Sequence, residues 1–355
     1  MSVLELARPE ILALQPYSSA RIEATGGEVM LNANESPWPP SGVVTDPPLN
    51  RYPDPQPCSL VERLAELHGV ATDSILVGRG SDEMIDLLVR AFCRPGRDAV
   101  VTCPPTFGMY SVCAAVQGAP LLEVPLDEAF EIDFGALATV PDQARLVFLC
   151  SPGNPTGGLA PLAAIERLAE VLRGRALVVV DEAYIEFAAA PSAASVLQRH
   201  ANLCVLRTLS KAWALAGARI GCLLASAEIV GLLRRIMPPY PLPTPSTAAA
   251  LAALSTEGRE LTRQRVAVIA AERERMAAEL ARLPQVEAVL PSRANFLCVA
   301  FKDRAAACRH LLAGGVVVRD VSRHVRLAGY LRISIGQRDE NARVIDLLAS
   351  MESGR

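Results

Sequence analysis

The sequence predicts an α/β protein, in which a mainly parallel seven-stranded sheet is flanked by helices and followed by a smaller α+β C-terminal domain. Two observations predict this class. Short and nearly continuous apolar runs alternate with helical patterns, as expected of strands that are buried on both faces. The chain has 355 residues, which suffices for about two domains and for a core that needs neither a metal nor a disulfide.

Two proline clusters suggest where the domains begin and end. Eight prolines lie between Pro37 and Pro57, and five between Pro238 and Pro245. Each proline blocks a helix and pushes the residue before it towards extended backbone. The expected units are an N-terminal arm over residues 1–30, a large domain over 31–240 and a small C-terminal domain over 241–355.

The expected elements follow from the apolar periodicity. The strands of the large domain are expected at Ile75–Val77, Ala99–Thr102, Leu121–Val124, Arg145–Leu149, Ala176–Val180, Leu203–Leu206 and Ile220–Leu224. Its helices are expected at Ser81–Phe92, Phe107–Val116, Pro161–Arg173 and Ala227–Ile236. A long helix should begin beyond Thr247, with an outer face formed by Arg263, Arg265, Glu272, Arg273, Glu274 and Arg275. The small domain should contain Phe296–Phe301, Ala305–Ala313, Val316–Val318, Leu331–Ile335 and Asp339–Ser350.

Composition and charge exclude several classes of protein. Hydrophobic residues make up 51% and the net charge is −3, which argues against a nucleic-acid-binding or anionic-membrane-binding surface. The apolar stretch at the N-terminus is interrupted by Glu5, Arg8 and Glu10, unlike a secretory signal. Nine cysteines form no CxxC pair, and the four histidines lack zinc-ligand spacing. We therefore expect a cytoplasmic protein with reduced thiols and no metal site.

The segment Gly78–Glu83, with sequence GRGSDE, joins an expected strand to an expected helix. A dinucleotide fingerprint fails because Glu83 occupies the position of its third glycine. Two interpretations stay open. Backbone N–H groups at the helix start can bind an anion such as phosphate, or the segment is a turn with Ser81 as the helix N-cap.

Three further polar segments follow expected strands directly. They are Ser151–Gly157, Asp181–Tyr184 and Thr208–Lys211. Ligands of parallel α/β sheets bind outside the carboxyl ends of the strands, so these segments could converge on one crevice. Each also has a plain structural interpretation: a turn at the first, a solvated cap and a half-buried ring at the second, and a surface lysine at the third.

The chemistry of these segments is complementary and suits pyridoxal phosphate. Its aldehyde takes a lysine as a Schiff base, its ring nitrogen needs a carboxylate, and its phosphate needs a helix terminus and cations. Lys211 and Asp181 supply the first two groups. Arg219 carries a fork of donors that is suited to phosphate.

On these residues the chain resembles the fold-type-I pyridoxal-phosphate-dependent aminotransferases. The segments that carry this resemblance are Asn154–Gly157, Asp181–Tyr184, and Ser210-Lys211 with Arg219. Other segments resemble the histidinol-phosphate aminotransferases in particular: Leu31–Glu35, Arg51–Gln56, Gly78–Glu83, Cys103–Tyr110, Arg207–Ala212 and Val318–Asp320. The resemblance runs from about Tyr17 to the strand that contains Arg332.

The resemblance implies a role for each residue around the cofactor. Lys211 would bind the aldehyde and shuttle the substrate proton, and Asp181 would pair with the ring nitrogen. Tyr184 and Asn154 would hydrogen-bond the ring oxygen, and Phe107 would stack on the ring. The phosphate would be held by Gly80, Ser81, Asp82, Ser210 and Arg219, with Thr208 as a further candidate and Tyr52 of the partner subunit reaching across.

The resemblance also implies the substrates and the assembly. Tyr17, Asn34, Asn154, Arg319 and Arg332 would line the substrate side, and Arg332 would clamp the anionic group. The implied enzyme is a homodimer that moves an amino group reversibly between L-histidinol phosphate and 2-oxoglutarate in L-histidine biosynthesis. Two positions depart from the family pattern: Phe107 stands where tyrosine is frequent, and Gly153 stands where a more polar residue is common.

Three alternatives compete with this interpretation. An aromatic aminotransferase or a threonine-phosphate decarboxylase of the same fold would share Lys211, Asp181 and Arg219. A nicotinamide oxidoreductase could use the turn at Gly78–Gly80, but it leaves Asp181, Tyr184 and Lys211 without a role. A regulator built on the same scaffold would usually carry an added DNA-binding domain, and only a short arm precedes the scaffold here.

Overall fold

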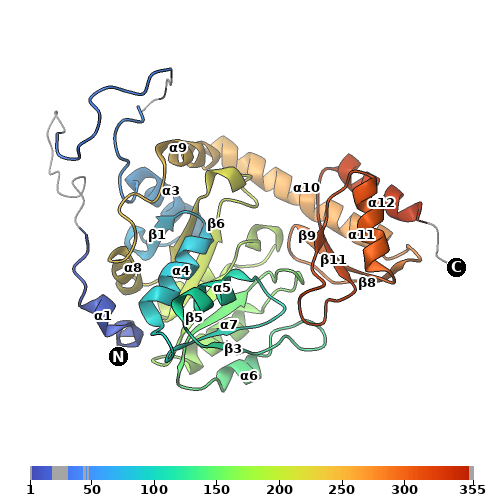
Figure 1. The fold of residues 1–355 in the computed structure, drawn as a ribbon, viewed down its shortest axis with the longest axis horizontal. Coiled ribbons are helices and arrows are strands. Elements are labelled where there is room, and N and C mark those ends of the chain that lie inside the picture. The colour runs from blue at the N-terminus through green and yellow to red at the C-terminus, as the bar shows by residue number, and fades with distance from the viewer. Residues whose placement is uncertain (1, 18–30, 43–44, 46–47, 352–355) are drawn as a thin grey trace.

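The structure is a computed structural model that describes residues 2–17, 31–42, 45 and 48–351. Figure 1 shows a larger unit built around one sheet, a smaller unit that carries the C-terminal helices, and helix α10 (Thr256–Leu280) running from the first to the second. Among the described helices, none combines the length and apolar character that a membrane span requires.

The larger unit contains a seven-stranded sheet in the order β1-β7-β6-β5-β4-β2-β3. Its strands are β1 (Ile75–Gly78), β2 (Ala99–Thr102), β3 (Leu121–Glu123), β4 (Ala144–Cys150), β5 (Leu177–Asp181), β6 (Leu203–Thr208) and β7 (Gly221–Leu224). Neighbouring strands run parallel, except that β7 is antiparallel to both β1 and β6. The predicted α/β class, with a mainly parallel seven-stranded sheet, is confirmed.

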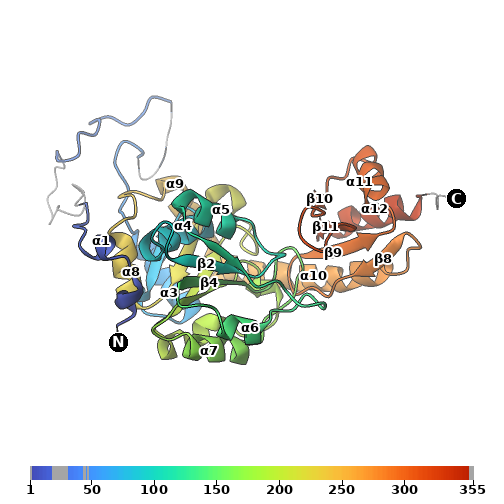
Figure 2. The ribbon, with the colours of Figure 1, turned by 60° about the horizontal axis from the view of Figure 1, so that its bottom comes forward.

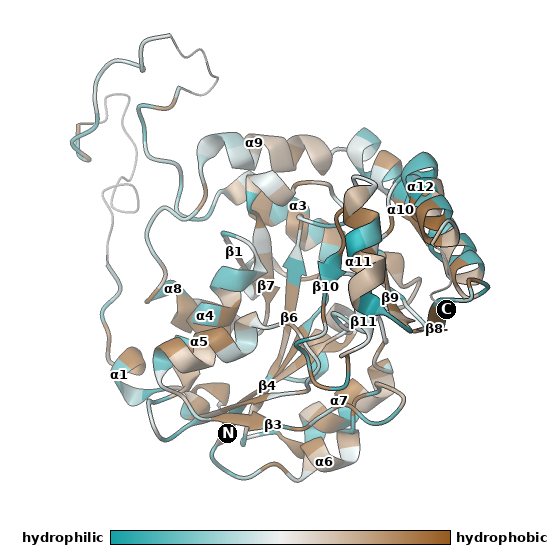
Figure 3. Ribbon diagram, turned by 45° about the vertical axis from the view of Figure 1, so that its right-hand side comes forward, coloured by the Kyte–Doolittle hydropathy of each residue, from teal (hydrophilic) through white to brown (hydrophobic). Residues whose placement is uncertain are grey.

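Helices cover both faces of this sheet. The helices of the larger unit are α1 (Pro9–Leu12), α3 (Cys58–His68), α4 (Ser81–Phe92), α5 (Met109–Gln117), α6 (Phe134–Ala138), α7 (Leu162–Val171), α8 (Ala227–Arg234) and α9 (Thr244–Ala253). Figure 2 shows α4 and α5 on one face and α6 and α7 on the other. Because β4 and β5 are buried on both sides, their sequences are almost wholly apolar, which Figure 3 shows as brown along β4.

The smaller unit is an antiparallel sheet of four strands in the order β10-β11-β9-β8. Its elements are β8 (Val286–Val289), β9 (Phe296–Phe301), α11 (Arg304–Ala313), β10 (Arg319–Asp320), β11 (Tyr330–Ser334) and α12 (Arg338–Ala349). The element expected at Val316–Val318 is absent from that segment, because pairing with β11 begins only at Arg319 and Val317 is 84% exposed. Strand β8 escaped prediction because half of its residues are exposed and it lacks a strong apolar pattern.

The helical region beyond the second proline cluster also differs from the prediction. It divides into α9, which ends at Ala253 with Leu254 as its C-cap, and α10, whose N-cap Ser255 accepts a hydrogen bond from the Gly258 N–H. Glu272 and Arg273, predicted on the outer face, are buried. Arg273 Nη1 donates to the carbonyl oxygens of Phe187 and Ala294 at 3.1 and 3.0 Å, so this cation satisfies backbone acceptors rather than facing solvent.

Helix α10 packs against elements of both units, including α9 on one side and β8, β9 and α12 on the other. The domain limits expected from the proline clusters therefore stay a prediction. A second link comes from Arg326, which donates to the carbonyl oxygens of Leu126 and Asp127 at 2.9 and 2.6 Å. Its guanidinium lies 4.6 Å from the centre of the Phe130 ring. Arg326 thus joins the loop before β11 to the loop after β3.

Candidate active site

A pocket lies where β4, β5 and β6 end, at the carboxyl edge of the parallel part of the sheet. The register pairs Cys150 with Asp181 and Asp181 with Leu206, so the segments after these strands begin side by side. Every described residue that the sequence assigned to the cofactor, apart from Tyr52, lines this pocket. They are Gly80, Ser81, Asp82, Phe107, Asn154, Asp181, Tyr184, Thr208, Ser210, Lys211 and Arg219.

Asp181 ends β5 and is 2% exposed. Its Oδ1 accepts a hydrogen bond from the Ala183 N–H at 3.1 Å, and its Oδ2 accepts one from the Tyr110 hydroxyl at 2.7 Å. Burial raises the pKa of Asp181 to about 6, against the lowering effect of these two hydrogen bonds and of the Lys211 charge. Such a carboxylate is poised to pair with a buried cationic group.

Lys211 follows β6, and its Nζ lies 5.6 Å from the centre of the Tyr184 ring. Partial burial lowers the pKa of Lys211, and the positive charges of Arg332 and Arg219 lower it further, while Asp82 and Asp181 oppose the shift. A lowered pKa increases the share of neutral amine, which is the form that can act as a nucleophile or a base.

Tyr184 and Asn154 form one polar wall of the pocket. Asn154 Nδ2 donates to the Tyr184 hydroxyl at 3.3 Å, and Asn154 Oδ1 accepts a hydrogen bond from Arg332. Phe296 of β9 contacts both Tyr184 and Arg332. Its ring meets Tyr184 edge-on at 5.2 Å, and the Arg332 guanidinium lies 5.3 Å from its centre. This chain of contacts brings Arg332, from the smaller unit, to the mouth of the pocket.

The start of α4 forms the opposite end of the pocket. Its N-cap is Gly80, with φ of +82°, and within the described chain no side chain caps the first N–H groups. The interpretation as a turn capped by Ser81 is therefore wrong, and the unfilled donors form a candidate anion site. Arg219 stands beside them, with its Nη2 3.2 Å from Asp82 Oδ2. Ser210 N–H donates to Thr208 Oγ1 at 3.1 Å and fixes the adjoining turn.

The remaining predicted residues lie outside this pocket. Tyr52 stacks on Tyr240, with ring centres 4.5 Å apart, and lines a separate surface pocket together with Asn34. Tyr17 is 71% exposed. Arg319 sits directly opposite Arg332 in the β10–β11 pair. The structure therefore brings Arg332 towards Lys211 but leaves Tyr17, Asn34 and Tyr52 away from it.

Two side chains at the pocket escaped the sequence prediction. Tyr110 contacts Asp181, although only its neighbour Phe107 had been selected from that segment. Its position three residues after Phe107, at the start of α5, could have placed both rings on the same side of a helix. Cys150 ends β4 beside Asp181 and lines the pocket. Burial raises the pKa of its thiol to about 12, so Cys150 stays protonated and is a poor nucleophile.

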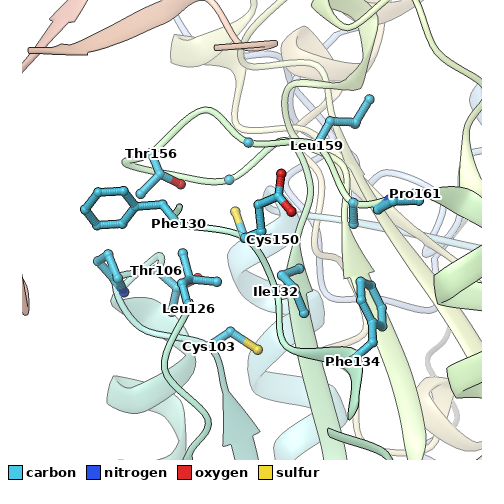
Figure 4. A pocket seen from close by; sticks show the side chains of 15 residues that line it. Cys103, Thr106, Leu126, Phe130, Ile132, Phe134, Cys150, Thr156, Leu159 and Pro161 are labelled. Carbon is cyan, nitrogen blue, oxygen red and sulfur yellow. The ribbon is translucent and has the colours of Figure 1, made fainter. Parts of the chain in front are cut away.

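A second cavity adjoins the pocket and shares Cys150 with it. Figure 4 shows that its walls are mostly apolar, with Phe130, Ile132 and Phe134 on one segment and Leu159 on another. Its lining includes no titratable pair comparable to Lys211 and Asp181 among the described residues. The chemistry of the site therefore belongs to the first pocket.

The donors of the first pocket fit pyridoxal phosphate, the cofactor that the sequence resemblance implies. The uncapped start of α4 and Arg219 suit its phosphate, and the buried Asp181 suits a protonated ring nitrogen. Lys211, with its lowered pKa, suits the aldehyde. These three features lie in one pocket. Without a bound ligand, each of them would cost folding free energy or have no function.

Comparison with known proteins gives the family. Residues 27–348 match the family described as aminotransferase class I and II. Histidinol-phosphate aminotransferase of Xanthomonas euvesicatoria is 52% identical over 98% of this chain and 97% of that protein, and that of Stenotrophomonas maltophilia is 53% identical over the same shares.

A solved structure agrees with these relatives. The crystal structure of histidinol-phosphate aminotransferase from Sinorhizobium meliloti, in complex with pyridoxal-5'-phosphate, superposes with a TM-score of 0.76 at 29% identity. The match covers 85% of this chain and 82% of that chain. The chain therefore belongs to the class I and II aminotransferases and, among them, to the histidinol-phosphate aminotransferase family.

Proposed function

We propose that this protein is a pyridoxal-phosphate-dependent aminotransferase that exchanges an amino group between L-histidinol phosphate and 2-oxoglutarate, as a step of L-histidine biosynthesis. The family and the names of its close relatives support this assignment. The observation that carries it is the meeting of Lys211 with Asp181 in one pocket beside an uncapped helix start. The reaction is reversible and proceeds in two halves, with the first product leaving before the second substrate binds.

Each residue of the pocket has its own role in the proposed reaction. Pyridoxal phosphate supplies an aldehyde that carries the amino group and a protonated ring that withdraws electrons. Asp181 keeps its negative charge for the ring nitrogen, which favours the protonated ring. Lys211 Nζ takes the proton from the substrate carbon and returns it, which requires the neutral amine that its lowered pKa supports. Tyr184 and Asn154 orient the ring oxygen through their own hydrogen bond.

Arg332 is the proposed clamp for the anionic end of each substrate. Its guanidinium is held by Asn154 and by the face of Phe296, which preorganises a planar fork of donors. Such a fork accepts a carboxylate as well as a phosphate. One arginine can therefore serve both 2-oxoglutarate and histidinol phosphate. Arg319, opposite it across β10 and β11, adds a second positive charge at the same edge.

The sequence offers a clean test of the lysine, because Lys211 and Lys302 are its only two lysines. Lys302 follows β9, is exposed and lies outside the pocket, so Lys302→Ala is a matched control. Borohydride reduction in the presence of the cofactor should add its mass to the Lys211 peptide in the wild type and in Lys302→Ala. Lys211→Ala should show neither the added mass nor turnover. A fully active Lys211→Ala enzyme would refute the proposal.

The substrate class is tested by comparing three amino donors on the same enzyme. Turnover of L-histidinol phosphate should exceed that of phenylalanine and of threonine phosphate. Preferred turnover of phenylalanine would indicate an aromatic aminotransferase, and loss of carbon dioxide from threonine phosphate would indicate a decarboxylase. Either result would overturn the assigned substrate while leaving the cofactor chemistry intact.

The homodimer and the cytoplasmic location form part of the same proposal. Tyr52 stacks on Tyr240 away from the pocket of its own chain, so its expected phosphate contact requires Tyr52 of the partner subunit. Mixing inactive Lys211→Ala subunits with weakened Tyr52→Ala subunits should restore activity, because a mixed dimer has one intact site. No gain on mixing would count against this. All nine cysteines are free thiols in the described structure.

A further inference from the structure

We propose that Tyr110 is a positioning residue that holds Asp181 ionised and correctly oriented for the ring nitrogen of the cofactor. This inference rests on the proposed function, and it assigns a role to a side chain that neither touches the substrate nor had been selected from the sequence. Three features carry it: the hydrogen bond between the two side chains, the complete burial of the pair, and the packing that fixes the Tyr110 ring.

The two carboxylate oxygens of Asp181 accept hydrogen bonds from donors on different elements. Tyr110, from α5, donates to Oδ2 at 2.7 Å, and the Ala183 N–H donates to Oδ1 at 3.1 Å. Each oxygen therefore has one fixed donor, and the plane of the carboxylate is set. A third donor approaching from the pocket, such as a protonated ring nitrogen, meets a carboxylate that needs no further rotation.

The Tyr110 ring cannot easily leave this position. It is 0% exposed and stacks on Phe148 of β4, with ring centres 4.6 Å apart and planes 9° from parallel. Its other neighbour, Phe107, meets it edge-on at 5.7 Å. These contacts would be satisfied equally by phenylalanine, so the packing alone does not explain a hydroxyl at this buried place. The hydroxyl is explained by the carboxylate that accepts its hydrogen bond.

The electrostatics support the same conclusion. Burial raises the pKa of Asp181 to about 6, and the Tyr110 hydrogen bond is the largest of the effects that lower it. Burial and the nearby Asp181 raise the pKa of Tyr110 well above its usual value, so the phenol remains a donor over the working pH range. Without this donor the carboxyl would retain its proton to a higher pH and would be a weaker partner for a cationic ring.

Other titratable groups face Asp181 from the surrounding elements. They are Asp82 from α4, Cys150 from β4, Tyr184 from the segment after β5 and Lys211 from the segment after β6. All of them are retained when only the Tyr110 hydroxyl is removed. Because these groups are present in both proteins, the ratio of the Kd of Tyr110→Phe to the Kd of the wild type reports the effect of the Tyr110 hydroxyl alone.

The test compares Tyr110→Phe with the wild type and with Tyr330→Phe. Tyr330 is a partly buried tyrosine of β11 whose ring meets Phe130, so it serves as a matched control away from Asp181. Binding of pyridoxal phosphate to each apoprotein is followed by its absorbance. We expect Tyr110→Phe to raise the Kd about tenfold, which corresponds to about 1.4 kcal/mol, and Tyr330→Phe to leave it unchanged. Thermal unfolding of each apoprotein checks that the fold is retained.

A second ligand separates positioning from packing. In 1-deazapyridoxal phosphate a C–H group replaces the ring nitrogen, so no cationic donor faces Asp181. Tyr110→Phe and wild type should bind this analogue with nearly equal Kd. The ratio of Kd values for pyridoxal phosphate should also be larger near pH 6 than near pH 8.5, because the variant carboxyl is protonated over more of that range.

Equal loss of affinity for both ligands, independent of pH, would assign Tyr110 a packing role and overturn the inference. An unchanged Kd for pyridoxal phosphate in Tyr110→Phe would also overturn it. These results differ from failure of the proposed cofactor chemistry, in which the wild-type protein itself would bind neither ligand, and from failure of the assigned substrate, which would leave both Kd values unchanged.

Discussion

Gly221 supports the anion site from behind, and replacing it tests whether the start of α4 holds the cofactor phosphate. Gly221 begins β7 and lies opposite Gly78 of β1 and Thr208 of β6. A Cβ atom at this position would lie 2.4 Å from Ser81 N and 2.5 Å from the carbonyl carbon of Gly80. Both atoms belong to the backbone that offers the N–H groups of the site, so Gly221→Ala must move the site itself.

The free-energy cost of Gly221→Ala follows from the size of this steric overlap. Non-bonded carbon atoms are in favourable contact at about 3.5–4.0 Å, so the two segments must separate by about 1 Å. Inserting a methyl group into a packed interior costs typically about 1–3 kcal/mol. If the whole cost arises only when the site takes its binding geometry, the Kd for pyridoxal phosphate rises by about 5- to 150-fold. Any part of the cost that the apoprotein already carries lowers its free energy of unfolding instead, so the two effects together should amount to about 1–3 kcal/mol.

Gly231→Ala is the matched control. Gly231 lies in α8, is exposed, and a Cβ there would meet nothing within 4 Å in the described structure. Alanine should stabilise this helix by about 0.5–1 kcal/mol and leave the cofactor Kd unchanged. The assay is titration of each apoprotein with pyridoxal phosphate, together with urea unfolding. If Gly221→Ala binds the cofactor as tightly as Gly231→Ala does, the start of α4 is not the phosphate site.

Two further predictions concern stability. The pKa of Asp181 is raised from 3.8 to about 6, so its ionisation destabilises the apoprotein above about pH 6 and has no effect below about pH 4. Asp181→Asn should therefore raise the free energy of unfolding by up to about 3 kcal/mol at pH 8. Urea unfolding of the variant and the wild type at pH 8 and at pH 4 measures this difference. Arg326 has φ of +64° and donates to the Leu126 and Asp127 carbonyl oxygens. Arg326→Ala should lower the free energy of unfolding by about 1 kcal/mol, whereas Arg326→Gly should lower it less, because glycine relieves the left-handed backbone; urea unfolding that ranks the two variants in the reverse order would contradict this.

Much of the larger unit could be predicted from the sequence. Its strands are buried on both faces, and such strands leave a continuous apolar run that ends abruptly at polar residues. For β5 the run Leu177–Val180 ends at Asp181, so the strand and the candidate carboxylate were found together. The parallel arrangement then required the segments after β4, β5 and β6 to meet, and they do meet in one pocket.

The smaller unit and the long helix were harder to predict for a physical reason. Strand β8 and helix α10 are half exposed, so their sequences carry charges that do not reveal which face is covered. Arg273 looks like a surface residue in the sequence, and its burial follows only from two carbonyl groups that belong to residues 187 and 294. No local pattern around Arg273 contains that information, because both acceptors come from distant parts of the chain.

Tyr110 represents a third case, in which the sequence carries a signal for a residue that supports the site without contacting the cofactor. Tyr110 hydrogen-bonds Asp181 and packs on Phe148 and Phe107, and it does not line the cofactor pocket. Yet a carboxylate that is 2% exposed must obtain hydrogen bonds from its surroundings or lose its charge. The burial of Asp181 therefore implies at least one side-chain or backbone donor behind it. Once β5 is recognised as a central strand, a tyrosine from a helix that covers the same end of the sheet is the expected candidate.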